Sequence, residues 1–182
     1  RRAQWLNRFP KHIMHNLRGN MQTRLHKLHT ESWDAAIFAQ AGLERIELRP
    51  ESSFELDWML PAPAQGAIMV AARKADEHIL AACHTINDKD TALCTYIERT
   101  FLRGLLGGCS TPVSAYARIK ENKIHFKGNI FSPDGTLKVE IEKEALVTDS
   151  ENLGSECAEE VLNKGGREIN VMIREQIKKS SA

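Results

Sequence analysis

The chain has 182 residues, of which 42% are hydrophobic and 27% are charged, as expected for one large globular domain or two small ones. Its 25 Lys and Arg residues are balanced by 24 Asp and Glu residues, and the net charge of +1 argues against a protein that is basic throughout. No apolar run approaches the roughly 20 residues of a membrane-spanning helix, and the N-terminal residues lack the apolar core of a signal peptide. We therefore expect a soluble protein without a membrane partner.

The N-terminal part of the chain alternates between helix-like and strand-like patterns. Residues 2–8 are predicted to be helical, residues 13–16 are short and apolar enough for a buried strand, and apolar residues recur at helical spacing over residues 21–28. Residues 33–39 are predicted to form another buried strand. Strand–helix alternation of this kind predicts an α/β domain with a parallel sheet.

The middle of the chain contains a predicted hinge. Proline and small residues dominate residues 61–66, and a strand-like run follows at residues 67–71. Residues 76–84 and 91–105 are then predicted to be helical. Apolar residues of the second helix recur every four positions, at Leu93, Ile97, Phe101 and Leu105.

The C-terminal part predicts an α+β domain with a three-stranded antiparallel sheet. Strand patterns cover residues 113–119, 124–131 and 137–141, joined by Glu121-Asn122 and by the turn sequence SPDG at residues 132–135. Two helices are predicted after the sheet, with Gly165-Gly166 stopping the first. Their apolar faces carry Cys157, Val161 and Leu162 in the first helix and Ile169, Ile173 and Ile177 in the second.

Positive charge is concentrated at the N-terminal end. Residues 1–30 contain seven Lys or Arg residues and four histidines but no acidic residue. Such a stretch attracts anions, and arginine suits carboxylates and phosphates because its planar guanidinium makes paired hydrogen bonds. A run of charges is more often a solvated face, so composition alone also leaves that interpretation open.

The cysteines and histidines show no metal-binding pattern. The four cysteines form no CxxC pair, which argues against a zinc site or a disulfide framework and favours a reducing compartment such as the cytoplasm. The histidines lack the HExxH spacing of zinc proteases, so no metal site is predicted.

Cys109 is the unusual cysteine because it follows two glycines and precedes Pro112. Glycines allow close approach to a thiol, and neighbouring cations such as Arg103 would favour the reactive thiolate. The alternative is a buried, inert cysteine, which is the usual state of a free thiol in a protein. Cys83, Cys94 and Cys157 are expected to be core or spectator residues of this kind.

Three segments together resemble the porphobilinogen deaminase (hydroxymethylbilane synthase) family. They are LRGNMQTR at residues 17–24, PAPAQGA at residues 61–67 and LGGCSTPV at residues 106–113, in the order found in the family. The resemblance covers nearly the whole chain. It implies a transferase of tetrapyrrole and heme biosynthesis that joins four porphobilinogen molecules onto a cysteine-linked dipyrromethane, with release of ammonia, and then liberates hydroxymethylbilane by hydrolysis.

The resemblance also implies a domain organisation. Residues 1–62 correspond to part of a second, periplasmic-binding-protein-like α/β domain, residues 63–86 to the hinge and return segment of a first domain, and residues 87–182 to the third domain, which carries the cofactor cysteine. Gln65-Gly66 matches the family's Gly-Gln-Gly crossover, although Ala64 replaces its first glycine. The chain starts within a helical pattern and is expected to begin in mid-domain.

Residue roles follow from the same resemblance. Cys109 corresponds to the thioether anchor of the dipyrromethane cofactor. The family's arginines hold acetate and propionate groups of the cofactor and of the growing pyrrole chain. Their counterparts are Arg1, Arg2, Arg18 and Arg24, with Gly19, for the cofactor, and Arg18, Arg24 and Arg45 for the substrate.

No catalytic residue is assigned within this chain. The family's catalytic aspartate is expected in the missing part of the first domain, and Asp34, Asp57, Asp76 and Asp134 do not lie in its motif. The chain alone is therefore expected to be an inactive fragment of an enzyme that acts as a monomer on porphobilinogen, a small molecule.

Two other classes of function remain as alternatives. A non-catalytic α/β module could bind a carboxylate or another anion through the basic cluster, but it leaves the loop around Cys109 unexplained. A nucleic-acid binder could use residues 1–27, but aromatic residues make up only 6% of the chain and no recognition motif accompanies the charges.

Overall fold

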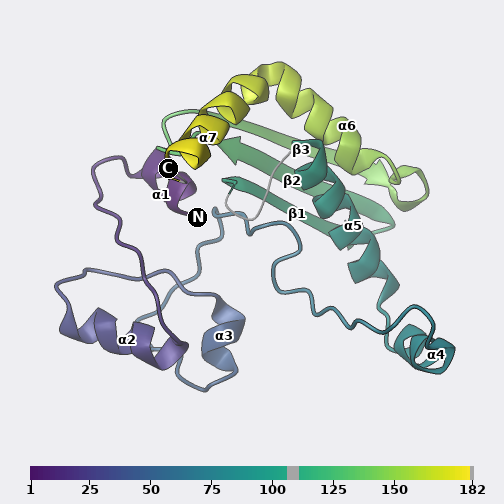
Figure 1. Cartoon of the computed structure of the whole chain (residues 1–182), viewed down its shortest axis with the longest axis horizontal. Coiled ribbons are helices and arrows are strands. Elements are labelled where there is room, and N and C mark those ends of the chain that lie inside the picture. Colours follow the sequence, from purple (N-terminus) through teal and green to yellow (C-terminus); the bar gives the residue numbers. More distant parts are fainter. Residues whose placement is uncertain (106–110, 181–182) are drawn as a thin grey trace. The chain divides into compact units, whose positions relative to one another are not determined.

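The computed structural model describes residues 1–105 and 111–180. The chain divides into two compact units: Arg1–Lys11 joins Trp58–Ala182 in the larger one, and His12–Asp57 forms the smaller one (Figure 1). These units do not have the limits of the three predicted domains, whose boundaries stay a prediction.

A three-stranded antiparallel sheet in the order β1-β2-β3 forms the centre of the larger unit (Figure 1). Its strands are β1 Val113–Lys120, β2 Lys123–Phe131 and β3 Lys138–Leu146. Glu121 and Asn122 join the first two strands with φ angles of 52° and 60°, as in the mirror-image turns whose twist matches that of paired strands. The predicted meander is confirmed, with β3 running beyond the predicted Ile141.

The helices of this unit are also largely as predicted. They are α4 Glu77–Thr85, α5 Lys89–Gly104, α6 Leu153–Val161 and α7 Arg167–Ser180. A short 3-10 turn, Val147–Asp149, precedes α6. A π-helical turn, Leu162–Gly166, links α6 to α7 and bends at Gly165, where φ is 111°. The two glycines therefore produce a kink between consecutive helices.

A single apolar core lies between the helices and one face of the sheet. Phe101 of α5 packs edge-on against Phe126 of β2, with ring centroids 5.1 Å apart. The predicted four-residue stripe of α5 is buried at Ile97, Phe101 and Leu105, and Cys157 and Val161 of α6 complete the same core. In α7, Ile169 and Ile173 of the predicted stripe are buried, whereas its third member, Ile177, is 45% exposed.

The first helix, α1 Arg2–Arg8, packs against the turn that follows β2. Asn7 Nδ2 donates a hydrogen bond of 2.7 Å to the carbonyl oxygen of Gly135. A Cβ at Gly135, where φ is 80°, would lie 2.6 Å from the carbonyl oxygen of Ala3, so only glycine allows this approach. The rings of Trp5 and Trp58 also lie 5.8 Å apart, which joins the helix to the chain that re-enters the unit.

The smaller unit contains α2 Met21–Thr30 and α3 Gln40–Glu44. Asn20 caps α2 by accepting a hydrogen bond of 2.8 Å from the backbone N–H of Thr23. The helix predicted from the spacing of residues 21–28 is therefore confirmed, and a further short helix follows at α3.

The structure contradicts three predicted strands, at residues 13–16, 33–39 and 67–71, which are irregular. Ile13 is 84% exposed and Ile68 is 90% exposed, so neither is a buried strand residue. An apolar run forms a strand only when neighbouring strands pair with its backbone groups. The described part of the chain provides no such neighbour, and the only sheet within it is antiparallel.

Candidate functional site

The Arg18-Gly19-Asn20 turn of the smaller unit has a specific local structure. Gly19 has a φ of 118°, and a Cβ there would lie 2.9 Å from Cγ2 of Thr23, so the position requires glycine. Arg24, one turn into α2, donates from Nε to the carbonyl oxygen of Gly19 at 2.8 Å. This bond orients the guanidinium and leaves its Nη groups available to a bound anion.

The other predicted arginines are exposed. Within the described ranges, the side chains of Arg2, Arg18 and Arg45 make no hydrogen bond or ion pair. Arg1 differs, because its Nη1 donates to Oε1 of Gln65 at 3.0 Å.

The structure thus places the predicted arginines in both units. It brings together Arg24 and Gly19 in the smaller unit, and Arg1 and Arg2 at the start of α1 in the larger unit. Cys109 lies outside the described residues.

The predicted hinge is a tight turn within the larger unit. Ala64 has a φ of 58° and Gly66 a φ of 89°, so both adopt the left-handed conformation that glycine prefers. Ala64 therefore occupies a position where a glycine would be unstrained. Oε1 of Gln65 accepts hydrogen bonds from the backbone N–H of Ala62 at 3.2 Å and from Arg1, which closes the turn.

A buried carboxylate lies beneath this turn. Glu98 of α5 is only 5% exposed, and its two oxygens accept hydrogen bonds from the backbone N–H groups of Ala64 at 2.6 Å and Ala117 at 2.8 Å. Burial raises the pKa of Glu98, because desolvation outweighs the opposite effect of the two hydrogen bonds.

A buried amide joins α1 to the same region. Gln4, 4% exposed, donates from Nε2 to the carbonyl oxygen of Leu60 at 2.9 Å and to Oγ of Ser114 at 2.8 Å. Its Oε1 accepts from the backbone N–H of Leu60 at 3.0 Å. A further backbone bond, from Ala115 N–H to the carbonyl oxygen of Pro61, joins this segment to β1.

Sequence reasoning missed both Gln4 and Glu98. A signal existed for Glu98, which lies four residues after Cys94 and three before Phe101, and hence on the buried side of the helix. A charged residue at such a position must have polar partners, because an unpaired buried charge is costly.

Two of the remaining cysteines are core residues, as predicted. Burial raises the pKa of Cys157 to about 11, and burial and the nearby Glu98 raise that of Cys94. Little thiolate forms at neutral pH at either position, so neither is suited to covalent chemistry. Cys83 is half-buried.

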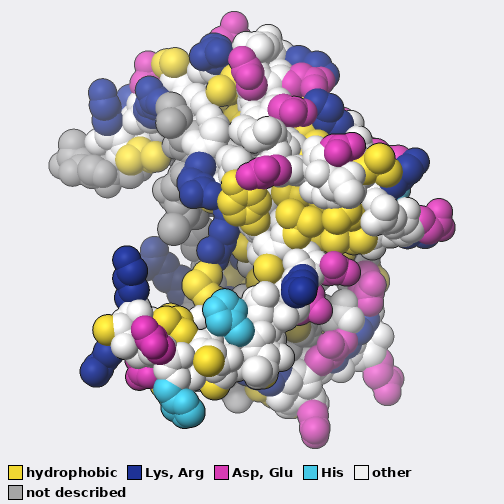
Figure 2. Space-filling view, turned by 90° about the vertical axis from the view of Figure 1, so that its right-hand side faces the viewer, with side chains coloured by type: hydrophobic (Ala, Val, Ile, Leu, Met, Phe, Trp, Pro, Cys, Tyr) yellow, Lys and Arg dark blue, Asp and Glu magenta, His cyan; other side chains and the backbone are white. Residues whose placement is uncertain are grey.

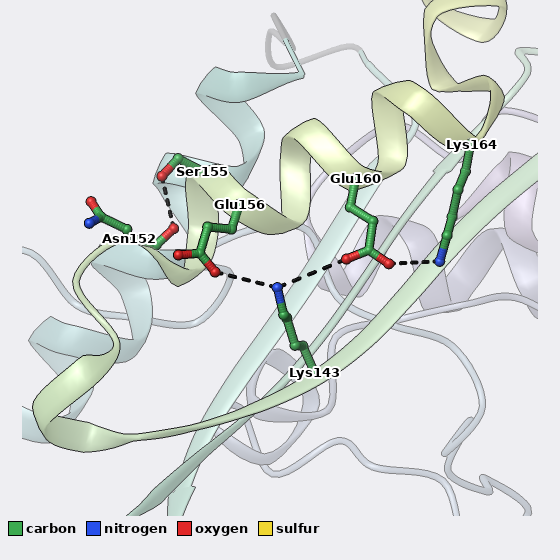
Figure 3. Close-up of polar contacts among 6 residues, drawn as sticks. All are labelled: Lys143, Asn152, Ser155, Glu156, Glu160 and Lys164. Carbon is green, nitrogen blue, oxygen red and sulfur yellow. Dashed lines mark hydrogen bonds and ion pairs between the residues drawn. The ribbon is translucent and has the colours of Figure 1, made fainter.

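An open surface hollow on the larger unit is occupied by ion pairs. Lys143 of β3 reaches between Glu156 and Glu160 of α6, at 3.3 Å and 3.9 Å, and Lys164 lies 2.7 Å from Glu160 (Figure 3). Glu159 and Asn163 complete the lining. The hollow contains none of the predicted site residues and, with its charges paired, offers no single-sign binding surface.

Other classes of site are not evident in the described residues. They contain no group of three His, Cys, Asp or Glu side chains placed to hold a metal ion. None of the described helices has both the length and the apolar character needed to cross a membrane. Figure 2 shows acidic and basic side chains interspersed on the face that it draws, and not a uniformly basic surface.

Two family models match the chain in sequence order. Residues 1–81 match "Porphobilinogen deaminase, dipyromethane cofactor binding domain", and residues 92–163 match "Porphobilinogen deaminase, C-terminal domain". The chain belongs to the porphobilinogen deaminase family. This confirms the family resemblance drawn from the RGN, crossover and cysteine segments.

Curated relatives agree with this membership. A porphobilinogen deaminase of Helicobacter hepaticus is 40% identical over 162 residues, covering 85% of this chain and 50% of the relative. One of Thermus thermophilus is 38% identical over 177 residues (96% and 59%), and one of Listeria monocytogenes is 35% identical over 174 residues (93% and 56%). The chain thus spans about half the length of the curated relatives that it matches.

Proposed function

We propose that this chain forms part of a hydroxymethylbilane synthase, which condenses four porphobilinogen molecules on a dipyrromethane attached to Cys109. The observation that carries the proposal is that the family's cofactor-binding model and its C-terminal model match in order on one chain, at residues 1–81 and 92–163. A non-catalytic anion-binding module would not account for a match that extends over the C-terminal domain.

The arginines fit the chemistry of this cofactor. Pyrrole acetate and propionate groups are carboxylates, for which a guanidinium is the best-matched partner. Arg24 is oriented by its bond to Gly19, while Arg18 and Arg45 have no side-chain partner among the described residues. Arg18, Arg24 and Arg45 bind substrate carboxylates, and Arg1 and Arg2 join Arg18 and Arg24 in holding the cofactor.

Cys109 carries the cofactor through a thioether bond. When bound, the dipyrromethane supplies the terminal pyrrole carbon to which porphobilinogen units are added. The raised pKa values of Cys94 and Cys157 support this choice among the thiols, because burial makes those two poor nucleophiles.

The finer features of the fold belong to the same proposal. In the complete enzyme, residues 1–62 belong to a periplasmic-binding-protein-like α/β domain, and residues 63–86 are the hinge and the segment that returns to the first domain. The complete enzyme is a cytoplasmic monomer, and the catalytic aspartate lies in its first domain, outside this chain.

Intact mass spectrometry tests the attachment. The wild-type chain and Cys83→Ser should each carry a two-pyrrole increment over the calculated mass, and Cys109→Ser should have the calculated mass. An increment that persists in Cys109→Ser would contradict attachment at this residue. An unmodified wild-type mass would contradict cofactor loading by this chain.

Calorimetric titration with porphobilinogen tests the arginines. Arg18→Ala and Arg24→Ala should each weaken binding roughly tenfold, as expected for loss of a charge-assisted hydrogen bond. Arg49→Ala is the matched control, because Arg49 already pairs with Glu44 and Glu55 within the same unit. Equal losses in all three variants would contradict a specific carboxylate site and indicate only a general effect of positive charge.

A further inference from the structure

Three chain segments meet at the carboxylate of Glu98. The residue belongs to α5. One of its oxygens accepts a hydrogen bond from the backbone N–H of Ala117 in β1, and the other accepts from that of Ala64 in the tight turn at residues 62–66, which we call the crossover turn. In the sequence, α5 ends just before residues 106–110 and β1 begins just after them. One side chain therefore joins the crossover turn to the two elements that flank this segment.

The crossover turn is also hydrogen-bonded to Arg1. Gln65 follows Ala64 directly, and its Oε1 accepts from both the backbone N–H of Ala62 and Nη1 of Arg1. Two hydrogen bonds, joined by the covalent backbone between Ala64 and Gln65, thus link Glu98 to the Arg1 guanidinium within the larger unit.

The backbone at Ala64 shows why this turn needs an external partner. Its φ of 58° is unfavourable for a residue with a Cβ, so the turn is not formed by local preference alone. A charge-assisted hydrogen bond to a buried carboxylate is strong enough to hold such a residue in place.

We propose that Glu98 is a positioning residue that locks the crossover turn, and through Gln65 the Arg1 guanidinium, against the elements that flank Cys109 in the sequence. The importance of this lock for carboxylate binding rests on the proposed function. The lock itself is a property of the described residues and can be measured without any ligand.

Amide hydrogen exchange, followed by NMR, tests the lock. In Glu98→Gln, the amide oxygen can still accept from Ala117, which is fixed in the sheet, but the amide NH₂ cannot accept from Ala64. We expect exchange at Ala64 and at Ala62 to be roughly tenfold faster, with amides of β2 such as Phe126 unchanged. Glu159→Gln makes the same chemical change at an exposed position and should leave all of these rates unchanged.

A rescue experiment separates positioning from general support of the core. Ala64→Gly removes the backbone strain, so adding it to Glu98→Gln should restore slow exchange at Ala62. Unchanged Ala62 exchange in Glu98→Gln would overturn the proposal, as would equal acceleration at Ala62 and Phe126. If Glu98→Gln does not fold, amide exchange in the wild type tests the proposal. Slow exchange at Ala64 would support the lock, and fast exchange there would show that it is absent.

Porphobilinogen titration then connects the lock to binding. If the wild type binds, Glu98→Gln should bind several-fold more weakly and Glu98→Gln with Ala64→Gly should recover, whereas unchanged affinity in Glu98→Gln would overturn the positioning role. If the wild type does not bind, the proposed function fails, while the exchange rates still decide whether Glu98 locks the turn.

Discussion

The two units of the chain differ sharply in what holds them together. The larger unit has a continuous core shared by α5, α6, α7 and the three strands. Across residues 12–57, every one of which the structure describes, Leu43 is the only buried residue, and α2 buries none. The smaller unit is therefore held mainly by helix caps, turns and surface ion pairs.

The buried core and most of the predicted binding arginines therefore lie in different units. Short helices without a packed apolar face are marginal in water, so the smaller unit by itself should open easily. It nevertheless carries three of the five predicted arginines, Arg18, Arg24 and Arg45. The larger unit supplies a rigid support in which Arg1 is bonded to a turn that is itself bonded to Glu98.

The largest expected effect comes from breaking the core of the larger unit. Phe101 is fully buried against Phe126, so Phe101→Ala should lower the free energy of unfolding by about 3–5 kcal/mol. Leu25→Ala, at a half-buried position of α2, should change the same transition by less than about 0.5 kcal/mol. Urea unfolding of both variants measures this, and a comparable loss in Leu25→Ala would show that the two units share one cooperative core.

Glu98 should give the larger unit a distinctive pH dependence. Its pKa is raised in the folded state by burial, so the folded protein holds this proton at pH values where the unfolded chain has released it. The contribution of this group to the free energy of unfolding is therefore fully present below the pKa of the unfolded chain, near 4.5, and is lost as the pH rises through the higher pKa of the folded state.

The measurement is urea unfolding of wild type and Glu98→Gln between pH 4 and pH 8. As the pH rises through that window, the free energy of unfolding of the wild type should fall relative to that of Glu98→Gln. A constant difference would show that the carboxyl has the same pKa in both states. Glu98 and burial raise the pKa of the Cys94 thiol, which therefore stays neutral throughout this window.

A matched pair of helix caps compares the units directly. Asp88 caps α5 through the backbone N–H of Thr91 at 2.7 Å, and Asn20 caps α2 through that of Thr23 at 2.8 Å. Asp88→Ala should lower the urea midpoint of the larger unit, whereas Asn20→Ala should reduce helix content by circular dichroism without moving that midpoint. An equal shift of the midpoint in both variants would contradict the independence of the units.

The same pair differs in its response to pH. Hydrogen bonds from Thr91 lower the pKa of Asp88, so its contribution is present above the unfolded value of 3.8 and is lost as the pH falls through the folded value. The destabilisation by Asp88→Ala should therefore be larger at pH 7 than at pH 3. Asn20 does not titrate, so the effect of Asn20→Ala on helix content should be the same at pH 7 and pH 3.

Sequence reasoning succeeded where local pattern and burial agree. The period-two strands after residue 113 and the four-residue stripe of α5 bury the predicted side chains, because each element packs against others in the same unit. It failed at residues 13–16, 33–39 and 67–71, where apolar runs have no described strand beside them. Local sequence specifies an apolar segment but not the partner that would pair with it.

The candidate site was predictable in part for a similar reason. Gly19 and Asn20 act through their neighbours in sequence, so the turn before α2 could be read from the RGN pattern. The partners of Glu98 are 34 and 19 residues away, at Ala64 and Ala117, and both are backbone N–H groups. Nothing in the side chains at those two positions marks them as hydrogen-bond donors, so this junction required the structure.

The smallest effect is expected on the strand positions outside the core. Lys127 and Glu142 are opposite each other on β2 and β3, with Nζ and Oε1 2.7 Å apart, but both side chains are largely exposed. A double-mutant cycle with Lys127→Ala and Glu142→Ala should give a coupling below about 1 kcal/mol that decreases further in high salt, because water already solvates both charges. A coupling as large as the loss in Phe101→Ala would mean that surface charge, and not the core, distinguishes the larger unit from residues 12–57.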